Sequence, residues 1–238
     1  MEPELKPVAP RYLPYLDSAR GIAALMVLFG HYTGWKFNSH PVIRVTNFIF
    51  NAPDAVSFFF VLSGMVLTYQ YLVLDKKLDI RKYYVNRFLR LFPAFFITVL
   101  LNALYWQRHN FGLYAIYHDI FLGNNGFWKE AVLVRPATQF YIPGWTLVIE
   151  LSVSFFIPYL IVLARVNRQL LWWLILSSLL VARIMDAFVM HFILGVALSA
   201  YYFYINSPEF KCTRWYRFRH IILLLSIVLF SIRRIQDV

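Results

Sequence analysis

Seven blocks of mostly apolar residues divide this 238-residue chain, and their lengths constrain its fold more than any other feature. A helix needs about 20 such residues to cross the hydrocarbon core of a bilayer. Hydrophobic residues make up 60% of the chain and charged residues 15%, whereas a soluble domain has about 25% charged residues. The pattern predicts an all-α, polytopic transmembrane helical bundle with about seven spans. The blocks run over residues 16–35, 55–74, 91–107, 145–164, 170–187, 188–206 and 220–233.

The net charge of +11 would by itself fit a nucleic-acid-binding protein. The basic residues, however, cluster in the gaps between apolar blocks, where membrane topology places them, and no recognition motif accompanies them. We therefore expect contact with a lipid bilayer and with no nucleic acid. The single cysteine, Cys212, excludes an internal disulfide framework, and the histidines form no cluster with metal-ligand spacing, so no metal site is predicted.

Lysines and arginines in the short gaps set the orientation of a helical membrane protein. They fill alternate gaps, so these gaps should all be cytoplasmic, with the N-terminus inside and the first block running outward. That block has no small-residue cleavage site after it, so we expect a retained span of a multi-pass inner-membrane protein. The long segment 108–143 then lies outside, with a short interfacial helix at 112–123. The basic residues are Lys76, Lys77, Arg81, Lys82, Arg87 and Arg90, then Arg165 and Arg168, then Lys211, Arg214, Arg217 and Arg219.

Arg20 and His31 stand at the two ends of the stretch RGIAALMVLFGH in the first block. Eleven helical positions turn the chain by about 1100°, close to three full turns, so both side chains face the same side, about 16 Å apart along the axis. Ionisable groups inside a membrane are costly and normally face a polar cavity or a partner. The pair therefore suggests a polar path through the bundle, with an imidazole suited to proton transfer near its outer end. The alternative is that Arg20 is a topology anchor and His31 an interfacial residue.

Two short motifs in the second and third blocks admit both a structural and a functional interpretation. In FFFVLSG, Ser63 and Gly64 are small enough to let another helix or a ligand approach closely. Arg87 and Arg90, in NRFLRLFP, lie at i and i+3 and share a face at the cytoplasmic entry of the third block. Two guanidiniums on one face suit a phosphate-bearing ligand, but they equally suit plain anchoring at the cytoplasmic surface.

Glu150 ends the stretch YIPGWTLVIE and lies about one and a half turns into the fourth block. An unpaired carboxylate is expensive at that depth. We therefore expect Glu150 to have a partner such as His31, an arginine or a substrate hydroxyl. His191, near the start of the sixth block, is the one other histidine with a claim to a role in a site.

These motifs occur in a recognisable order: Arg-x10-His, FFxLSG, Arg-x-x-Arg and Trp-x-x-x-x-Glu. Together they resemble the acyltransferase-3 family of integral membrane acyltransferases, and the string HFILGVALS resembles a further family segment. The resemblance covers residues 12–205. It implies an O-acyltransferase of the polysaccharide O-acetyltransferase type. Its donor substrate would be acetyl-CoA or another acyl-CoA, and its acceptor an extracytoplasmic carbohydrate such as O-antigen lipopolysaccharide or exopolysaccharide.

Two features depart from the family pattern. Family members commonly carry an acidic residue directly before the FF pair, where this chain has Ser57, and Asp54, one helical turn earlier, is a candidate substitute. Family members also have about ten spans, against about seven here. We expect a single membrane-embedded domain over residues 1–238 that is either shortened or lacks its C-terminal helices.

The resemblance and the helix geometry together suggest roles for individual residues. His31 is a catalytic candidate, either as general base on the acceptor hydroxyl or as an acylated nucleophile. Glu150 is a second catalytic candidate, which would orient His31 or bind the sugar. Donor phosphates would rest on Arg20, Arg87 and Arg90, helped by Lys82. Supporting residues of the site are Ser63, Gly64, Asp54 and Trp145. No permanently bound cofactor is expected. Two alternatives stay open: a non-catalytic component of glycan export, such as a transporter, and an inactive, truncated acyltransferase.

Overall fold

The computed structural model describes residues 9–11, 13–36, 52–107, 144–181, 188–222 and 225. Within them every regular element is an α-helix, which confirms the predicted all-α class. The interfacial helix predicted at 112–123 lies outside the described residues, as does most of the seventh block. The helices are α1 (Pro14–Lys36), α3 (Ala52–Leu72), α4 (Ile80–Gln107), α7 (Gly144–Val166), α8 (Leu170–Val181), α9 (Phe188–Ala200), α10 (Tyr202–Ile205), α11 (Pro208–Lys211) and α12 (Arg214–Arg217).

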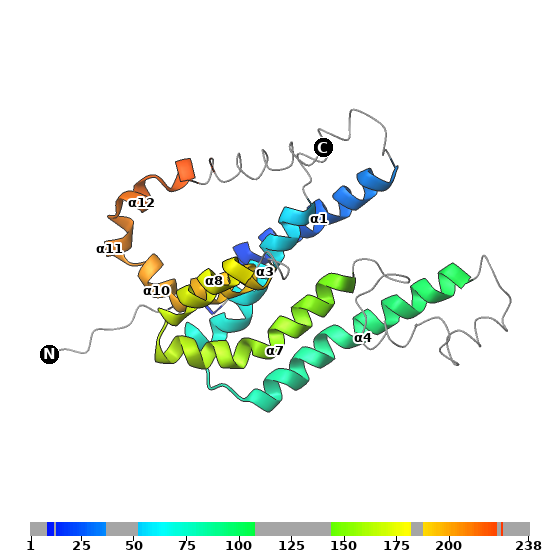
Figure 1. The fold of residues 1–238 in the computed structure, drawn as a ribbon, viewed down its shortest axis with the longest axis horizontal. Helices are drawn as coiled ribbons and strands as arrows, with labels where there is room; N and C mark the ends of the chain where they lie inside the picture. The colour runs from blue at the N-terminus through cyan, green and yellow to red at the C-terminus, as the bar shows by residue number, and fades with distance from the viewer. Residues whose placement is uncertain are drawn as a thin grey trace. The chain divides into compact units, whose positions relative to one another are not determined.

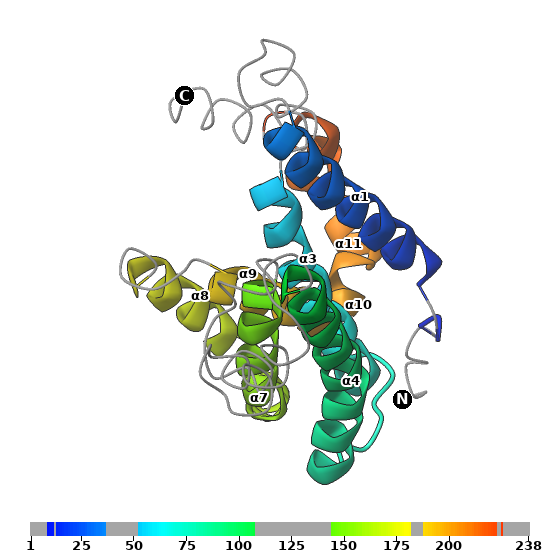
Figure 2. The ribbon, with the colours of Figure 1, turned by 90° about the vertical axis from the view of Figure 1, so that its right-hand side faces the viewer.

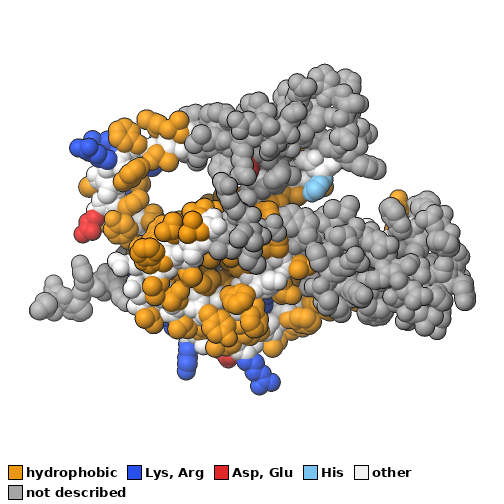
Figure 3. All heavy atoms as spheres, viewed as in Figure 1, with side chains coloured by type: hydrophobic (Ala, Val, Ile, Leu, Met, Phe, Trp, Pro, Cys, Tyr) orange, Lys and Arg blue, Asp and Glu red, His pale blue; other side chains and the backbone are white. Residues whose placement is uncertain are grey.

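Three of the described helices are long and apolar enough to cross a membrane: α3 over Asp54–Leu72, α4 over Ile80–Asn102 and α7 over Thr146–Val166. Two more, α8 and α9, are apolar but shorter in their described parts. Hydrophobic side chains cover most of the described surface in Figure 3, with the projecting Lys and Arg side chains at its margins. These features confirm a helical membrane protein, while the number of seven spans stays a prediction.

The third helix begins earlier than the apolar block predicted. α4 starts at Ile80, and Asp79 explains the start, because its Oδ1 accepts a hydrogen bond from the backbone N–H of Lys82 at 3.0 Å. Such an N-cap satisfies a donor that the first helical turn would otherwise leave unpaired. As a consequence, Arg87 and Arg90 both lie inside a continuous helix, as their predicted i, i+3 pairing on one face requires.

The sixth predicted block, 188–206, is interrupted. α9 ends at Ala200, and Tyr201 leaves the helical conformation with φ −102° and ψ 11°. The one-turn helices α10, α11 and α12 follow, and the side chains of Ser207 and Thr213 cap the last two by accepting backbone N–H groups three residues further on. The basic segment after α9 is therefore built from short capped turns.

The described helices fall into two compact units. The first comprises Met1–Lys76 and Tyr159–Val238, and the second comprises Lys77–Pro158. In the first unit α3 packs against α9 and α1, and α8 packs against α9 (Figure 2). The second unit is formed by α4 and the first part of α7, which run alongside each other (Figure 1).

Small residues allow α3 and α9 to approach closely. A Cβ atom built on Gly64 or on Gly195 would collide with backbone atoms of the facing helix. One turn after Gly195, the hydroxyl of Ser199 donates a hydrogen bond to the backbone carbonyl oxygen of Met65 at 2.8 Å. Small residues and interhelical hydrogen bonds hold helices together where lipid supplies no hydrophobic drive for association. The α3–α9 crossing is therefore the packing centre of the first unit.

Arg165, near the end of α7, holds the loop that follows α3. Its Nη2 donates to the carbonyl oxygens of Tyr71 at 2.9 Å and Lys76 at 3.2 Å, and it pairs with Asp75 at 3.3 Å. Asp75 has a φ of 51°, in the left-handed region that non-glycine residues adopt infrequently. Arg165, one of the basic residues that the sequence assigned to a cytoplasmic gap, thus has a structural role in the first unit.

Candidate functional site

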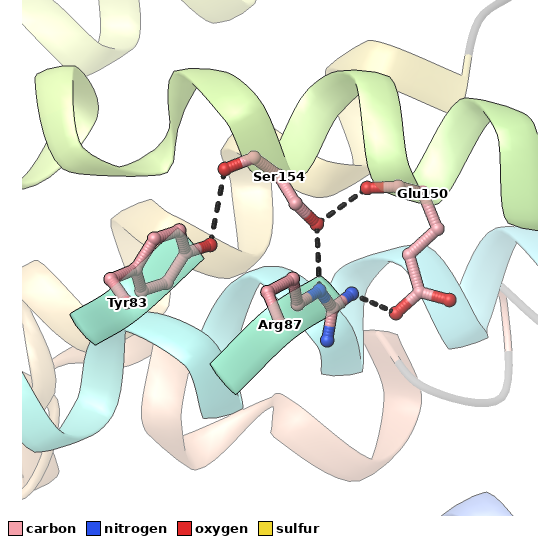
Figure 4. A network of polar contacts seen from close by, with 4 residues as sticks. All are labelled: Tyr83, Arg87, Glu150 and Ser154. Atoms are coloured by element: carbon pink, nitrogen blue, oxygen red, sulfur yellow. Dashed lines mark hydrogen bonds and ion pairs between the residues drawn. The ribbon is translucent and has the colours of Figure 1, made fainter. Parts of the chain in front are cut away.

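The second unit contains a polar network between its two helices (Figure 4). On α4, Nη2 of Arg87 donates to Oε1 of Glu150 on α7, forming an ion pair. Nε of the same guanidinium donates to Oγ of Ser154 at 3.1 Å. The Ser154 hydroxyl in turn donates to the backbone carbonyl oxygen of Glu150. Because Glu150 and Ser154 are four residues apart on one helix, they present both acceptors to Arg87 from the same face.

The network is shielded from the surroundings. The side chain of Arg87 is 9% exposed and that of Glu150 is 23% exposed, while Ser154 is fully buried. Among the described residues, Arg87 is the only charged residue that is buried. Burying a charged side chain is costly unless the charge is paired and hydrogen-bonded. The carboxylate and the hydroxyl offset this cost by pairing the charge and accepting two of its hydrogen bonds.

The guanidinium of Arg87 keeps hydrogen-bonding capacity beyond these contacts. A guanidinium carries five N–H donors, of which Ser154 and Glu150 accept two, leaving three. Within the part of the chain that the structure describes, no further residue accepts from Arg87. The network can therefore present a fixed cation with unused donors to a ligand.

Tyrosine hydroxyls of α4 also donate hydrogen bonds to backbone carbonyl oxygens of α7, and a proline explains one of these bonds. Pro158 lies inside α7 and has no N–H, so the carbonyl oxygen of Ser154, four residues earlier, lacks its helical donor. The buried hydroxyl of Tyr83 donates to that oxygen at 3.1 Å. The neighbouring Tyr84, which is half-buried, donates to the carbonyl oxygen of Phe155 at 2.8 Å. Tyr83 thus satisfies a backbone group that the bilayer core could not.

The structure brings together two residues that the sequence assigned to a site, Arg87 and Glu150. An arginine was one of the three kinds of partner expected for Glu150, and Arg87 is that partner. Arg90, three residues further along α4, is exposed, as is Lys82 near the start of the helix. The two arginines of the Arg-x-x-Arg motif therefore differ in environment, with Arg87 held by the protein and Arg90 accessible.

Arg20 and His31 belong to the first unit and lie on one continuous helix, α1. The helical geometry that places them on a common face therefore holds. Nη1 of Arg20 lies 3.9 Å from Oδ1 of Asp17, and 24% of the arginine side chain is exposed. His31 is exposed. A polar path from His31 to the residues of the second unit stays a prediction.

The proposed supporting residues have different surroundings. Asp54 lies half-buried in the first turn of α3. Ser63 is buried, and Gly64 stands at the α3–α9 crossing, so the close approach that the sequence required there involves another helix. Trp145 lies on α7, but its side chain is outside the described residues. His191 is half-buried on α9.

Sequence reasoning missed Ser154 and Tyr83. The signal that could have found them is helical spacing, because Ser154 follows Glu150 by four residues and Tyr83 precedes Arg87 by four. Residues at this spacing lie on the same face of a helix. A polar residue one turn from a predicted buried charge is therefore a candidate partner.

An open hollow of about 680 Å³ lies elsewhere, in the first unit. Its polar rim carries Arg165 and Arg168, and none of the predicted site residues lines it. Both guanidiniums already have partners, Arg165 in the loop after α3 and Arg168 over the ring of Tyr201, 5.1 Å from its centroid. Among the described residues, no three His, Cys, Asp or Glu side chains gather to form a potential metal site.

Apolar helices long enough to cross a membrane, with a largely buried ion pair between two of them, are the features of a helical membrane protein. The model of the acyltransferase domain of the acyltransferase-3 family matches residues 13–233. The chain therefore belongs to the acyltransferase-3 family, and the resemblance seen in its motifs is confirmed. Nodulation protein 10 of Rhizobium leguminosarum bv. viciae is 32% identical over 90 residues, which cover 37% of this chain and 23% of that relative. No solved structure matches the chain.

Proposed function

We propose that the chain is an integral membrane O-acyltransferase. It moves an acyl group, in the simplest case acetyl, from acyl-CoA to a hydroxyl of a glycan outside the cytoplasm, such as O-antigen or exopolysaccharide. The ion pair of Arg87 and Glu150 carries the proposal, because ionisable residues on apolar helices of membrane-spanning length mark functional sites. Membership of an acyltransferase family supplies the class of chemistry that such a site would support.

The donor half of the proposed site uses the basic residues of α4. The guanidinium of Arg87 is held in place and keeps three N–H donors that no described residue accepts. Arg90, on the same helix, adds a second guanidinium that is exposed. One guanidinium can bind two phosphate oxygens at once, so both arginines suit the phosphates of a CoA thioester. Lys82, on the first turn of α4, and Arg20 on α1 supply further positive charge in this proposal.

The acceptor half uses His31. As a general base, its imidazole takes the proton of the glycan hydroxyl while that oxygen attacks the thioester carbonyl. The carbon–sulfur bond then breaks, the sulfur leaves as the thiolate of CoA, and the proton passes to it. In a second version the acyl group passes first to His31 and then to the glycan. Glu150 keeps the donor-binding cation in place in both versions.

The test uses the purified chain in nanodiscs, acetyl-CoA labelled on its acetyl group, and glycan prepared from cells that lack the gene. We expect label to move to the glycan in an ester linkage that mild alkali releases. If label reached neither glycan nor protein, the proposal would be wrong, and a role in glycan export without transfer would remain. Mass spectrometry of surface glycans from cells with and without the gene would then identify the acceptor by a lost acyl mass.

A further inference from the structure

We propose that Ser154 is a positioning residue: its hydroxyl orients the guanidinium of Arg87 so that the unused edge of that guanidinium receives the phosphate groups of acyl-CoA. This inference rests on the proposed function, because it assigns Arg87 to the donor. It adds a residue that neither the sequence motifs nor the family match singled out.

The Ser154 hydroxyl has a fixed direction. Its proton goes to the backbone carbonyl oxygen of Glu150, one turn earlier on α7. A hydroxyl has one proton and two lone pairs, so only acceptor capacity is left for Arg87. Ser154 is 1% exposed, and water therefore does not compete for these lone pairs. The contact of 3.1 Å between its Oγ and Nε of Arg87 is thus a directed hydrogen bond.

A charge pair alone would hold Arg87 less firmly. The contact between Nη2 and Glu150 fixes one point, about which the guanidinium plane could turn. The hydrogen bond from Nε to Ser154 fixes a second point on the same edge of the group. Nε and Nη2 form one edge of the planar guanidinium fork, so the second edge, with Nη1 and the other hydrogen of Nη2, has no acceptor among the described residues. Two parallel N–H groups on such an edge match two phosphate oxygens.

The experiment measures the KM for acyl-CoA and the affinity for labelled CoA, with the full chain in nanodiscs. Ser154→Ala should raise the KM about tenfold, as expected for the loss of a hydrogen bond to a charged group, while kcat at saturating donor changes little. Ser152→Ala is the matched control, because Ser152 makes the same i−4 hydrogen bond, to Val148 at 2.8 Å, from an exposed position without contact to Arg87. An unchanged KM in Ser154→Ala would overturn the inference.

A double-mutant cycle shows whether Ser154 acts through Arg87. Arg87→Lys keeps the positive charge but removes the Nε–H, so Ser154→Ala should cause no further rise in KM in that background. An equal rise in both backgrounds would mean that Ser154 acts through something else, and would overturn the inference. A purely structural role would lower the yield and kcat of Ser154→Ala in both backgrounds.

Two further measurements keep the outcomes distinct. If Ser154→Ala does not fold, Ser154→Cys replaces it, because a thiol has a similar volume but is a weaker hydrogen-bond acceptor. An affinity of Ser154→Cys for CoA equal to that of the unmodified chain would again overturn the inference. If the unmodified chain binds CoA without transferring an acyl group, the proposed function fails while the ratio of CoA affinities still decides the role of Ser154. If the unmodified chain binds no CoA, both proposals fall.

Discussion

The hydroxyl of Tyr83 on α4 donates a hydrogen bond to the carbonyl oxygen of Ser154 on α7, at 3.1 Å. That oxygen is the one that Pro158 deprives of a helical N–H donor. A proline inside a spanning helix is tolerated when a neighbouring helix satisfies the freed backbone group. The pairing also places the α7 backbone beside α4 at the turn from which Ser154 and Glu150 reach Arg87.

We therefore expect Tyr83→Phe to lower the free energy of unfolding by about 1–3 kcal/mol, because a buried carbonyl oxygen loses its donor. Thermal unfolding in detergent measures the change. Tyr84→Phe is the matched control, since the carbonyl oxygen of Phe155 has a helical donor in Tyr159 and Tyr84 is less buried. In a Pro158→Ala background, which restores an N–H to α7, Tyr83→Phe should cost less. An equal cost in both backgrounds would contradict this account of the proline.

The crossing of α3 and α9 gives a second stability prediction. Gly195→Ala should destabilise the protein by about 1–3 kcal/mol or more, because the added methyl group would meet backbone atoms of α3 that cannot rotate away. Gly21→Ala, on α1, is the control, since a Cβ there would have no atom within 4 Å. Size-exclusion profiles and melting curves of the two variants should differ clearly. Equal stability of both variants would show that α3 and α9 do not cross closely at Gly195.

The ion pair predicts a characteristic pattern of single and double variants. Arg87→Leu leaves the carboxylate of Glu150 without its cation in a poorly solvated place, and we expect a loss of about 3–5 kcal/mol of stability. Arg87→Leu combined with Glu150→Leu removes both charges and should recover much of that loss. Arg90→Leu should change stability little, because Arg90 is exposed. Additive losses in the double variant would contradict a direct pairing of Arg87 with Glu150.

The sequence predicted the helical class and the need for a partner at Glu150 because both follow from local rules: the length of apolar runs and the cost of a charge in lipid. It did not choose Arg87 from among the possible partners, since helical spacing defines a face but not the helix opposite that face. The same holds for Gly64, whose small size was evident while its neighbour on α9 was not. The early start of α4 is different, because Asp79 is a local cap that the apolar pattern alone overlooks.

The last prediction concerns His31, the candidate base. His31→Ala should lower the rate of acyl transfer by about 10²- to 10⁴-fold, as expected when a general base is lost. His31 is exposed on α1, so the variant should keep the melting temperature of the unmodified chain. His220→Ala, which also removes an exposed histidine, should leave transfer unchanged.

Quenched reactions analysed on denaturing gels separate the two versions of the mechanism. Label on the unmodified chain that is absent from His31→Ala supports an acyl-histidine, whereas label on the glycan alone supports a general base. Full transfer by His31→Ala would remove this residue from the chemistry, and Arg87 with Glu150 would then have to serve a different base.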